Sequence, residues 1–399
     1  MSLNQVISNE VLDIRDGTHD SPKYKDSGYP LITSKNLKQG IIDFSDVNLI
    51  SEEDYNAINK RSKVDKGDIL YSMIGSIGNY AIVEDEPDYA IKNVALFKFI
   101  DDRLYNRYFL HLLSSFVIER QIDRAMKGGT QKFVSLKILR NLKIPLPPLD
   151  QQKQIASILD TADTYRQKTK ALIKKYDALT QSLFLDMFGD PVRNPKGWDK
   201  KSLAEFIERL DTGVSVNSTD KTYSEDQIGI LKTSCVYSGI FRPKEAKVIR
   251  SDEYQRMKLN PTANSIIISR MNTTELVGKS AYIERDYPNL YLPDRLWQSS
   301  KGFLDHNVRW LAYALSLQSF MNEIGKISSG TSGSMKNISK KKYLSLSMIY
   351  PSYDLQNQFA ERVKAIEAQK TIAQQELEKA DNLFNSLLQK AFKGELCKK

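Results

Sequence analysis

The stretch that decides the fold is PLPPLDQQKQIASILD, residues 145–160, where a proline-bounded segment turns into a long run without Gly or Pro. A second copy of this transition, IYPSYDLQNQFAERV, occupies residues 349–363. The copies align at an offset of 204 residues, and the matched pairs include Lys132 with Lys336, Leu142 with Leu346, Pro147 with Pro351, Asp150 with Asp354 and Gln152 with Gln356. Self-similarity at a fixed offset indicates a repeated unit, so the chain is two copies of one module.

Each copy ends in a predicted long helix, at residues 150–188 and 354–399. Along both segments the apolar or small residues recur at steps that alternate between three and four, which predicts a heptad seam that packs on another helix. The predicted seam residues are Ile155, Ile158, Ala162, Tyr165, Thr169, Leu172, Tyr176, Leu179 and Leu183 in the first helix, and Phe359, Val363, Ile366, Ala373, Leu377, Ala380, Phe384, Leu387 and Ala391 in the second. The second pattern is interrupted only at Lys370.

The helix ends carry matching signals. Asp150 and Asp354 are predicted N-caps, and the helices are predicted to end by Gly189 and near Gly394. The two apolar stripes most simply bury each other, in an antiparallel coiled coil if a pseudo-twofold axis relates the modules. In the alternative arrangement, each helix packs only on its own globular part.

The remaining residues, 1–149 and 189–353, predict two similar globular domains. Short apolar strands separated by turns precede helical segments, so we expect an α+β fold with a curled sheet in each. The expected strands are residues 30–34, 40–44, 68–75, 79–83 and 94–100, then 229–234, 238–243, 265–270 and 280–284, and the expected helical segments are residues 104–126 and 306–325.

Composition limits the classes of protein further. The 399 residues include 58 Lys and Arg against 49 Asp and Glu, and the resulting net charge of +9 is compatible with a polyanionic partner. Two cysteines cannot form a disulfide framework and suit a reducing compartment. The N-terminal residues lack a signal-peptide pattern, and no apolar run approaches the roughly 20 residues of a membrane span, so we expect a cytoplasmic protein.

Catalytic motifs are missing from the sequence. The histidines His19, His111 and His306 are isolated, without metal-ligand spacing. A P-loop would need Gly where Thr273 stands, so residues 277–280 are expected to form a turn. Leucines flank Pro147-Pro148, and their side chains cannot accept the hydrogen bond that an adenine amino group donates in a methyltransferase loop. The chain is therefore expected to catalyse no reaction by itself, which excludes an autonomous nuclease or methyltransferase.

Several motifs together resemble the specificity subunit of type I restriction–modification enzymes. They are RDGTHDSPKY at residues 15–24, YPLITSKNLKQGIIDF at 29–44, VDKGDILYSMIGSIGN at 64–79 and the repeated entry at 145–160. The first module lacks a counterpart of PKGW, residues 195–198, which leads into the second domain, so its start is abbreviated or diverged.

The resemblance implies a non-catalytic DNA-binding protein of defence against foreign DNA. Two target-recognition domains would each read one half of a bipartite, asymmetric site in double-stranded DNA, and the coiled coil would set the spacer between the halves. Two methyltransferase (M) subunits and restriction-motor (R) subunits would assemble on the chain, for adenine methylation and DNA restriction. S-adenosylmethionine, ATP and Mg²⁺ would bind to those partners, and no cofactor to this chain.

Candidate DNA contacts are the polar and basic residues on the loops of each domain, because Lys suits phosphates whereas Asn, Gln and Arg can pair with base edges. In the first domain they are Thr18, His19, Lys23, Tyr24, Lys25, Ser34, Lys35, Asn36, Ser72, Ser76, Asn79, Lys127, Gln131 and Lys132. In the second they are Lys232, Thr233, Ser234, Tyr237, Arg242, Arg270, Asn272, Arg295, Gln298, Thr331 and Lys336. Arg270 and Asn272 are favoured, because they align with Met73 and Gly75 of the first domain.

One alternative of another class stays open at this stage. The chain could be a coiled-coil assembly protein whose globular ends bind proteins. DNA binding that weakens with salt would favour the specificity subunit, and a flat response to salt would favour the assembly protein.

Overall fold

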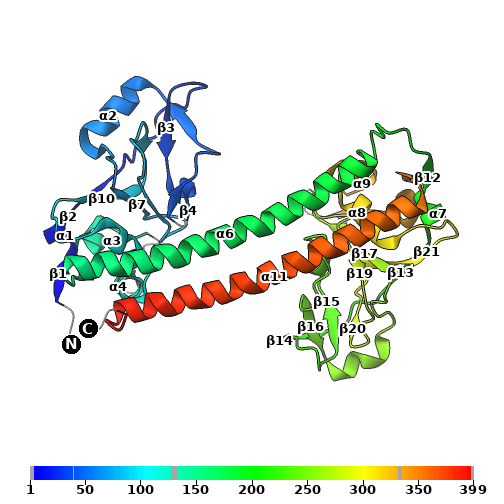
Figure 1. Ribbon diagram of the computed structural model, residues 1–399. Helices are drawn as coiled ribbons and strands as arrows, with labels where there is room; N and C mark the ends of the chain where they lie inside the picture. Colours follow the sequence, from blue (N-terminus) through cyan, green and yellow to red (C-terminus); the bar gives the residue numbers. More distant parts are fainter. Residues whose placement is uncertain (1–3, 39, 127–132, 331–334, 397–399) are drawn as a thin grey trace. The chain divides into compact units, whose positions relative to one another are not determined.

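The computed structural model describes residues 4–38, 40–126, 133–330 and 335–396, with the side chain of Asp220 left out. The chain divides into two compact units (Figure 1). Unit 1 combines Met1–Leu172 with Ala373–Lys399, and unit 2 is Ile173–Ile372. Each long helix therefore contributes one part to unit 1 and the other part to unit 2. No helix of the described residues is both long and apolar enough to cross a membrane.

Unit 1 is built from short strands and helices followed by a long helix. In chain order it contains β1 (Gln5–Ile7), α1 (Ser8–Val11), β2 (Leu12–Asp16), β3 (Tyr29–Ile32), η1 (Ser34–Asn36), β4 (Leu37–Lys38), β5 (Ile41–Ile42), β6 (Asn48–Ile50), α2 (Glu52–Ser62), β7 (Ile69–Ser72), β8 (Tyr80–Ile82), β9 (Ala90–Ile91), β10 (Val94–Phe99), α3 (Asn106–Leu113), α4 (Phe116–Met126), α5 (Leu136–Arg140), β11 (Lys143–Pro145) and the first part of α6 (Leu149–Phe188). The main sheet has the order β2-β10-β7-β8, and a smaller sheet has the order β6-β3-β9.

Unit 2 repeats this order with a few differences. It contains the end of α6, then β12 (Lys200–Ser202), α7 (Leu203–Phe206), β13 (Ile207–Thr212), β14 (Ser218–Thr222), β15 (Gly229–Leu231), η2 (Thr233–Val236), β16 (Ala246–Ile249), η3 (Ser251–Arg256), β17 (Ser265–Ser269), β18 (Met271–Asn272), β19 (Ser280–Ile283), β20 (Leu290–Tyr291), β21 (Leu296–Lys301), α8 (Val308–Ser316), α9 (Gln318–Ile327), β22 (Lys336–Asn337), α10 (Lys340–Leu344), β23 (Ser347–Ile349) and the start of α11 (Tyr353–Phe392). Unit 2 adds β14 and the pair β18-β22, lacks a counterpart of the pair β4-β5 among its described residues, and has the 3-10 helix η3 where unit 1 has α2.

The sheets of the two units have equivalent topology. The main sheet β13-β21-β17-β19 of unit 2 matches β2-β10-β7-β8 of unit 1, strand for strand. All pairs in both main sheets are antiparallel. In the smaller sheets, β3 pairs in parallel with β9, and β15 pairs in parallel with β20. The duplicated α+β fold expected from the sequence is confirmed.

Two local expectations are wrong. Residues 238–243 form no strand; apart from an isolated bridge at Ile240 they make a turn, and the neighbouring strand is β16. The helical segment of each unit is two helices, because the chain bends at Ser114-Ser115 and at Leu317. The turn expected at residues 277–280 is present at its start, with Gly278 at a φ of 86°, before β19 begins at residue 280.

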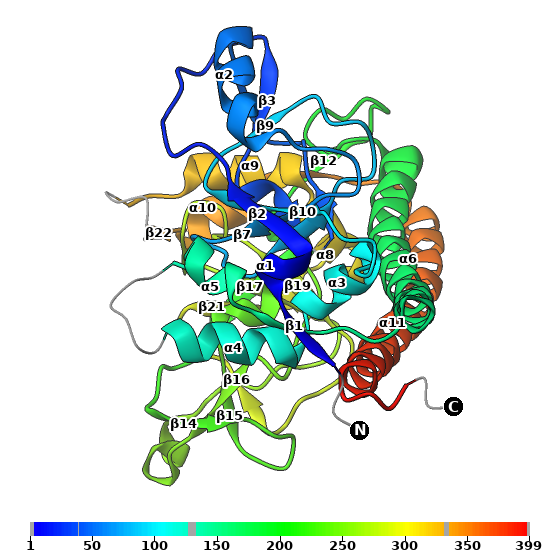
Figure 2. The same ribbon diagram turned by 90° about the vertical axis from the view of Figure 1, so that its left-hand side faces the viewer.

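The core of unit 1 lies between its main sheet and the long helices. Phe97 of β10 packs edge-on against Phe109 of α3, at 5.1 Å between ring centroids. Leu159 of α6 and Phe392 of α11 belong to the same apolar cluster. Figure 2 shows α3 placed between this sheet and α6. The last part of α11 thus completes the core of the first globular domain.

Unit 2 has an equivalent core, in which Phe188 of α6 and Phe359 of α11 pack with Trp310 of α8. In both units the long helices therefore pack on each other and also on the globular part. The pairing is antiparallel in each unit. Tyr165 donates to Glu376 at 3.3 Å within unit 1, and Lys370 pairs with Asp177 within unit 2.

The first turns of the long helices differ from the prediction. The helices begin at Leu149 and Tyr353, one residue before the expected caps, so Asp150 and Asp354 lie inside the first turn. The Ser352 hydroxyl accepts from the Leu355 amide at 3.4 Å and acts as the cap of α11. Carboxylates in a first turn still favour the helix through its dipole. The C-terminal signals are confirmed, because Gly189 and Gly394 have φ values of 75° and 74°.

The predicted seam of α11 is confirmed, since all of its residues are buried or half-buried. In α6 the prediction is half right. Ile155, Ala162, Thr169, Tyr176 and Leu183 are covered, whereas Ile158, Tyr165, Leu172 and Leu179 have exposed fractions of 38 to 49%. The true seam alternates those covered residues with Leu159, Arg166, Ile173 and Thr180. The error arose because two of these four are polar, while apolar residues stand one position earlier.

Polar seam residues are paired across the two helices. Arg166 has an exposed side-chain fraction of 17% and donates to Asp381 of α11 at 2.7 Å and to Asp163 at 2.7 Å. Its guanidinium also lies 4.3 Å from the ring centroid of Phe384. Because a buried charge needs a nearby partner, this contact fixes the register of the two helices in unit 1.

A buried glutamine joins each long helix to its own globular domain. Gln152 is fully buried; its side-chain oxygen accepts from the Tyr105 amide at 2.9 Å, and its amide donates to two backbone carbonyls. Gln356 holds the Asn307 amide and the Pro351 carbonyl in the same way, both at 2.9 Å. The repeat in the sequence therefore preserves the junction between helix and domain.

We expect Gln152→Ala to lower the free energy of unfolding by about 1–3 kcal/mol, because it removes the partner of one buried and two half-buried backbone hydrogen bonds. Urea denaturation followed by circular dichroism measures this change. Gln154→Ala is the matched control, since Gln154 is exposed on the same helix and should change the stability by less than about 0.5 kcal/mol. Equal values for the two variants would contradict the junction role.

Candidate nucleic-acid interface

The strand register of unit 1 brings several predicted loops to one end of the main sheet. Asp16 at the end of β2 pairs with Ala95, and Ser72 at the end of β7 pairs with Val94 at the start of β10. The opening loop after Asp16 and the loop after Ser72 therefore leave the sheet at the same end. The η1 segment reaches this place too, because a Cβ on Gly75 would lie 3.8 Å from the Ser34 hydroxyl.

Glycine fixes where the opening loop leaves the sheet. A Cβ on Gly17 would lie 2.3 Å from the Ile91 carbonyl, so only glycine fits there. The Thr18 amide then donates to that carbonyl at 3.0 Å. Gly213 and Val214 make the same approach to Leu292 in unit 2, with a hydrogen bond of 3.1 Å. Both opening loops are thus anchored by backbone contacts while their side chains vary.

The side chains around His19 hold the opening loop of unit 1. His19 Nδ1 lies 2.8 Å from Asn93 Oδ1, and His19 Nε2 lies 2.8 Å from Asp16 Oδ2. Arg61 from α2 donates to the other Asp16 oxygen at 2.7 Å. The hydrogen bond to the Asn93 side-chain oxygen, and then the one to the Asp16 carboxylate, raise the pKa of His19. Because both ring nitrogens face oxygen acceptors, the protonated imidazole fits this site best.

We therefore expect His19 to titrate above its usual value of about 6.5, and His306, whose pKa is lowered by burial, to titrate below it. A raised pKa means that the imidazolium stabilises the loop fully at acidic pH and that this contribution is lost as the pH rises through the folded-state pKa. NMR titration of the histidine ring signals measures both values. Asn93→Ala should move the His19 midpoint back toward 6.5, and a wild-type midpoint at or below 6.5 would contradict the assignment.

In unit 2 the favoured residues meet at the equivalent end of the sheet. Asn272 donates to the Tyr237 hydroxyl at 2.7 Å, and this hydroxyl lies 2.7 Å from Thr233 Oγ1. The Arg270 amide donates to the Arg295 carbonyl at 3.1 Å. Five residues that were predicted from separate parts of the sequence thus form one polar cluster.

One polar group of this cluster, in the guanidinium of Arg270, has no hydrogen-bond partner among the described residues. This group, Arg270 Nε, is buried. Lys336 lies opposite Asn272 in the pair β18-β22 and donates to the Gly330 carbonyl at 3.1 Å. A cationic group that is half-buried beside amide side chains suits a negatively charged or acceptor-rich ligand.

Three predicted contacts are corrected, because their side chains are buried and bonded within the chain. Asn36 is 2% exposed and caps the η1 turn, while Ser72 is fully buried and donates to the Ile74 carbonyl at 3.0 Å. Gln298 is 5% exposed and exchanges hydrogen bonds with the amide and hydroxyl of Thr262. These side chains hold loops in place and are not available to a ligand.

The other predicted contacts that the structure describes are exposed or half-buried. Lys35 forms an ion pair with Asp46 at 2.9 Å, and Ser234 donates to Glu245 at 2.7 Å. The side chains of Lys35 and Ser234 are therefore less available to a ligand than those of Lys23 and Arg242. Four predicted residues lie outside the described residues, namely Lys127, Gln131, Lys132 and Thr331.

Sequence reasoning missed the residues that position these loops. Asp16, Arg61 and Asn93 hold His19, and Ser215 bonds with Asp294 at the equivalent place in unit 2. A signal was available for Asn93, since Asn often occupies the left-handed conformation that this residue adopts, with a φ of 56°. No sequence signal indicated the contact of Arg61, because this residue lies 45 residues from Asp16 in the chain.

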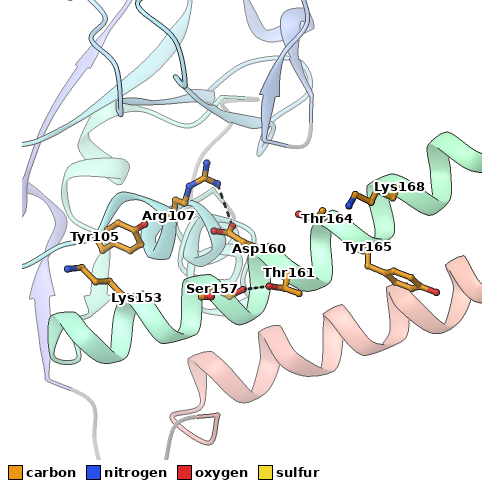
Figure 3. Close-up of a pocket in the computed structure, with 9 residues that line it drawn as sticks. All are labelled: Tyr105, Arg107, Lys153, Ser157, Asp160, Thr161, Thr164, Tyr165 and Lys168. Carbon is orange, nitrogen blue, oxygen red and sulfur yellow. Dashed lines mark hydrogen bonds and ion pairs between the residues drawn. The ribbon is translucent and has the colours of Figure 1, made fainter.

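A shallow pocket of about 630 Å³ lies away from these loops, between the start of α3 and α6 in unit 1 (Figure 3). Arg107 and Asp160 point toward one another across it, 3.6 Å apart, and Tyr165 points toward α11. Lys153 and Lys168 complete a polar lining. Within the described part of the chain, no three His, Cys, Asp or Glu side chains gather as a metal site.

The fold and the site together define a class of protein with two α+β recognition modules of the same design. Each module has polar loops at one end of a sheet and packs on a pair of antiparallel helices. Residues 7–175 match the family described as the Type I restriction modification DNA specificity domain. The EcoKI specificity subunit of Escherichia coli is 22% identical over 398 residues, which cover 93% of this chain and 83% of the relative.

Other comparisons agree. The EcoBI specificity subunit of Escherichia coli is 29% identical over 166 residues, which are 40% of this chain and 35% of the relative. The crystal structure of the S subunit from M. genitalium covers 98% of this chain and 96% of its own, with a TM-score of 0.59 and 16% identity, which shows the shared fold. Residues 7–175 thus match a type I DNA specificity domain, and most of the chain is similar to a type I specificity subunit. No comparison supports the alternative of a scaffold whose ends bind proteins.

Proposed function

We propose that this chain is the DNA-specificity subunit of a type I restriction–modification complex, in which each unit reads one half of a bipartite, asymmetric site. The observation that carries the proposal is the duplication itself. Both units gather loops at the same end of equivalent sheets, but the side chains on those loops differ. Two scaffolds of one design with different polar surfaces suit two different half-sites.

The long helices act as the ruler between the half-sites. An α-helix of 40 residues is roughly 60 Å long at 1.5 Å per residue, and DNA rises 3.4 Å per base pair. The seams of the two helices pair within each unit, which supports the proposal that the helix length sets the number of unread base pairs.

Methyltransferase subunits bind to the exposed side of α6. In unit 1, Ile158, Tyr165 and Leu172 repeat at seven-residue intervals and leave an apolar stripe on the helix surface. The polar pocket next to Tyr165 offers Lys153 and Lys168 to the same partner. S-adenosylmethionine would be held by that partner, and ATP with Mg²⁺ by the restriction subunits, so this chain supplies binding and no catalysis.

Co-expression with the methyltransferase partner, followed by genome-wide mapping of methylated adenines, tests the proposal. A split motif with a fixed spacer is the expected result. The binding constant of the complex for that motif should fall steeply with salt concentration. Unsplit methylation, or DNA binding that does not change with salt, would overturn the proposal.

Arg270→Ala is expected to relax or abolish recognition of one half-site and to leave the other unchanged. A bidentate contact from Arg to guanine contributes about 1–3 kcal/mol of discrimination, so modification at the wild-type motif should drop roughly fivefold or more. Mapping of methylated adenines in the variant measures this. Equal weakening on every DNA sequence would show that Arg270 contacts phosphate instead. Arg250→Ala is the control, because Arg250 is exposed and paired with Asp252.

A further inference from the structure

The two units carry one small ribbon at the same structural position. In unit 1 it is the isolated antiparallel bridge between Ile74 and Phe133, and in unit 2 it is the pair β18-β22, where Met271 faces Asn337. The hydrogen bonds beside the ribbon establish the equivalence. The Val134 amide donates to the Met73 carbonyl at 2.9 Å, and the Ile338 amide donates to the Arg270 carbonyl at 3.1 Å.

The side chains on this ribbon differ between the two units, most clearly where Asn337 of unit 2 stands in the place of Phe133. In unit 1, Ile74 is 43% exposed and Phe133 is 37% exposed, so two large apolar groups face the surface as a pair. In unit 2 the half-buried Met271 corresponds to Ile74, and the rest of the ribbon is polar, with Asn272, Lys336 and Asn337 next to Arg270. Asn337 Oδ1 and Arg270 Nε are both buried without a partner among the described residues. The backbone arrangement is thus shared, whereas unit 1 has an exposed pair of apolar side chains and unit 2 has mainly polar ones.

A short helix with an exposed lysine follows the ribbon in both units. Each ribbon leads within two or three residues into a short helix, α5 or α10, which is capped by a serine hydroxyl at 3.4 and 3.3 Å. Lys137 and Lys341 occupy equivalent positions on these helices; both are exposed, and neither has an ion pair among the described residues. An apolar pair beside a free lysine matches a DNA groove, where apolar base groups lie next to phosphates.

We propose that this ribbon determines the specificity of each unit, and that Ile74 and Phe133 of unit 1 contact the 5-methyl group of a thymine in its half-site. This inference rests on the proposed function. The 5-methyl group of thymine is the apolar group that bases present in the major groove. It is therefore the group in this groove that the exposed pair of apolar side chains would contact. The ribbon of unit 2, with amide and guanidinium groups, instead pairs with hydrogen-bonding base edges.

Deoxyuridine substitution tests the contact, because uracil lacks only the methyl group. The complex of the full chain with its methyltransferase partner is titrated, at one salt concentration, with DNA in which each thymine of the mapped motif is replaced singly. We expect one substitution to weaken wild-type binding about threefold to tenfold. The variant Phe133→Asn should bind the thymine and uracil forms of that site within about a factor of two of each other.

Ile100→Asn is the matched control. Ile100 is 63% exposed and follows β10 at the opposite end of the same sheet, so this variant should keep the wild-type sensitivity to uracil. Circular dichroism of both variants confirms that the surface changes leave the fold intact. The inference is overturned if no uracil substitution weakens wild-type binding, or if Phe133→Asn weakens both forms equally. A wild-type complex without a split motif would instead refute the proposed function.

Discussion

Four residues inserted into each long helix are expected to lengthen the preferred spacer by one to two base pairs and to leave both half-sites unchanged. The insertions lie between Leu172 and Ile173 in α6 and between Ile372 and Ala373 in α11. Four residues add roughly 6 Å, and one base pair spans 3.4 Å. Insertion of four residues only unwinds a coiled coil locally, so the two seams can still pair.

The spacer of the variant is read directly from the map of methylated adenines. A variant of unchanged length, in which the exposed residues Lys174 and Lys175 are replaced by Ala, is the control for sequence changes near the insertion. Methylation at the original spacer by the longer chain would show that the helices do not set the distance. New half-sites would show that the insertion disturbs the recognition domains themselves.

Phe384→Ala is expected to lower the free energy of unfolding by about 3–5 kcal/mol, as is typical when a large aromatic ring is removed from a core. Phe384 is 6% exposed, and its ring lies 6.1 Å from the His111 ring of α3. The same ring covers the guanidinium of Arg166, so the substitution also removes a cation–π contact and exposes the seam ion pair. The loss should appear in the unfolding of unit 1.

The neighbouring residue provides the control. Leu383 is 55% exposed, so Leu383→Ala should change the stability by less than about 0.5 kcal/mol. Urea denaturation with hydrogen exchange by mass spectrometry measures the loss and places it, because amides of α3 and β10 should lose protection in the Phe384 variant. Equal loss in both variants, or loss confined to unit 2, would show that α11 does not complete the first core.

The sequence contains strong signals for the repeat and for the long helices, because an offset of 204 residues and a period of seven persist over many positions. The sequence indicates less clearly which face of α6 is buried. Ile158 is as apolar as Leu159, yet Leu159 is fully buried whereas Ile158 is 38% exposed. One heptad later the covered residue is Arg166, and the apolar Tyr165 beside it is exposed. Apolar character alone therefore cannot tell a seam position from its neighbour.

The candidate site was predicted in part for a similar reason. Asn272, Tyr237 and Thr233 were predicted from separate segments, and the structure brings their side chains into hydrogen-bond contact at one end of the sheet. Gln298 looked equally suitable in the sequence, yet it lies within β21 and is buried. For a polar residue inside a strand, the sequence does not show whether its side chain is buried and hydrogen-bonded within the chain or is available to a ligand.

The contribution of α11 to the core of unit 1 has a consequence for biosynthesis. Phe384 and Phe392 complete a core whose other residues belong mainly to the first part of the chain, up to Ala162. On a ribosome, roughly 200 residues separate Leu172 from Ala373, and at about 5–20 residues per second their synthesis takes about 10–40 s. During this delay the apolar surface of α3 and β10 is not yet covered by the last part of α11. The first domain to be synthesised is therefore expected to be the last to become stable.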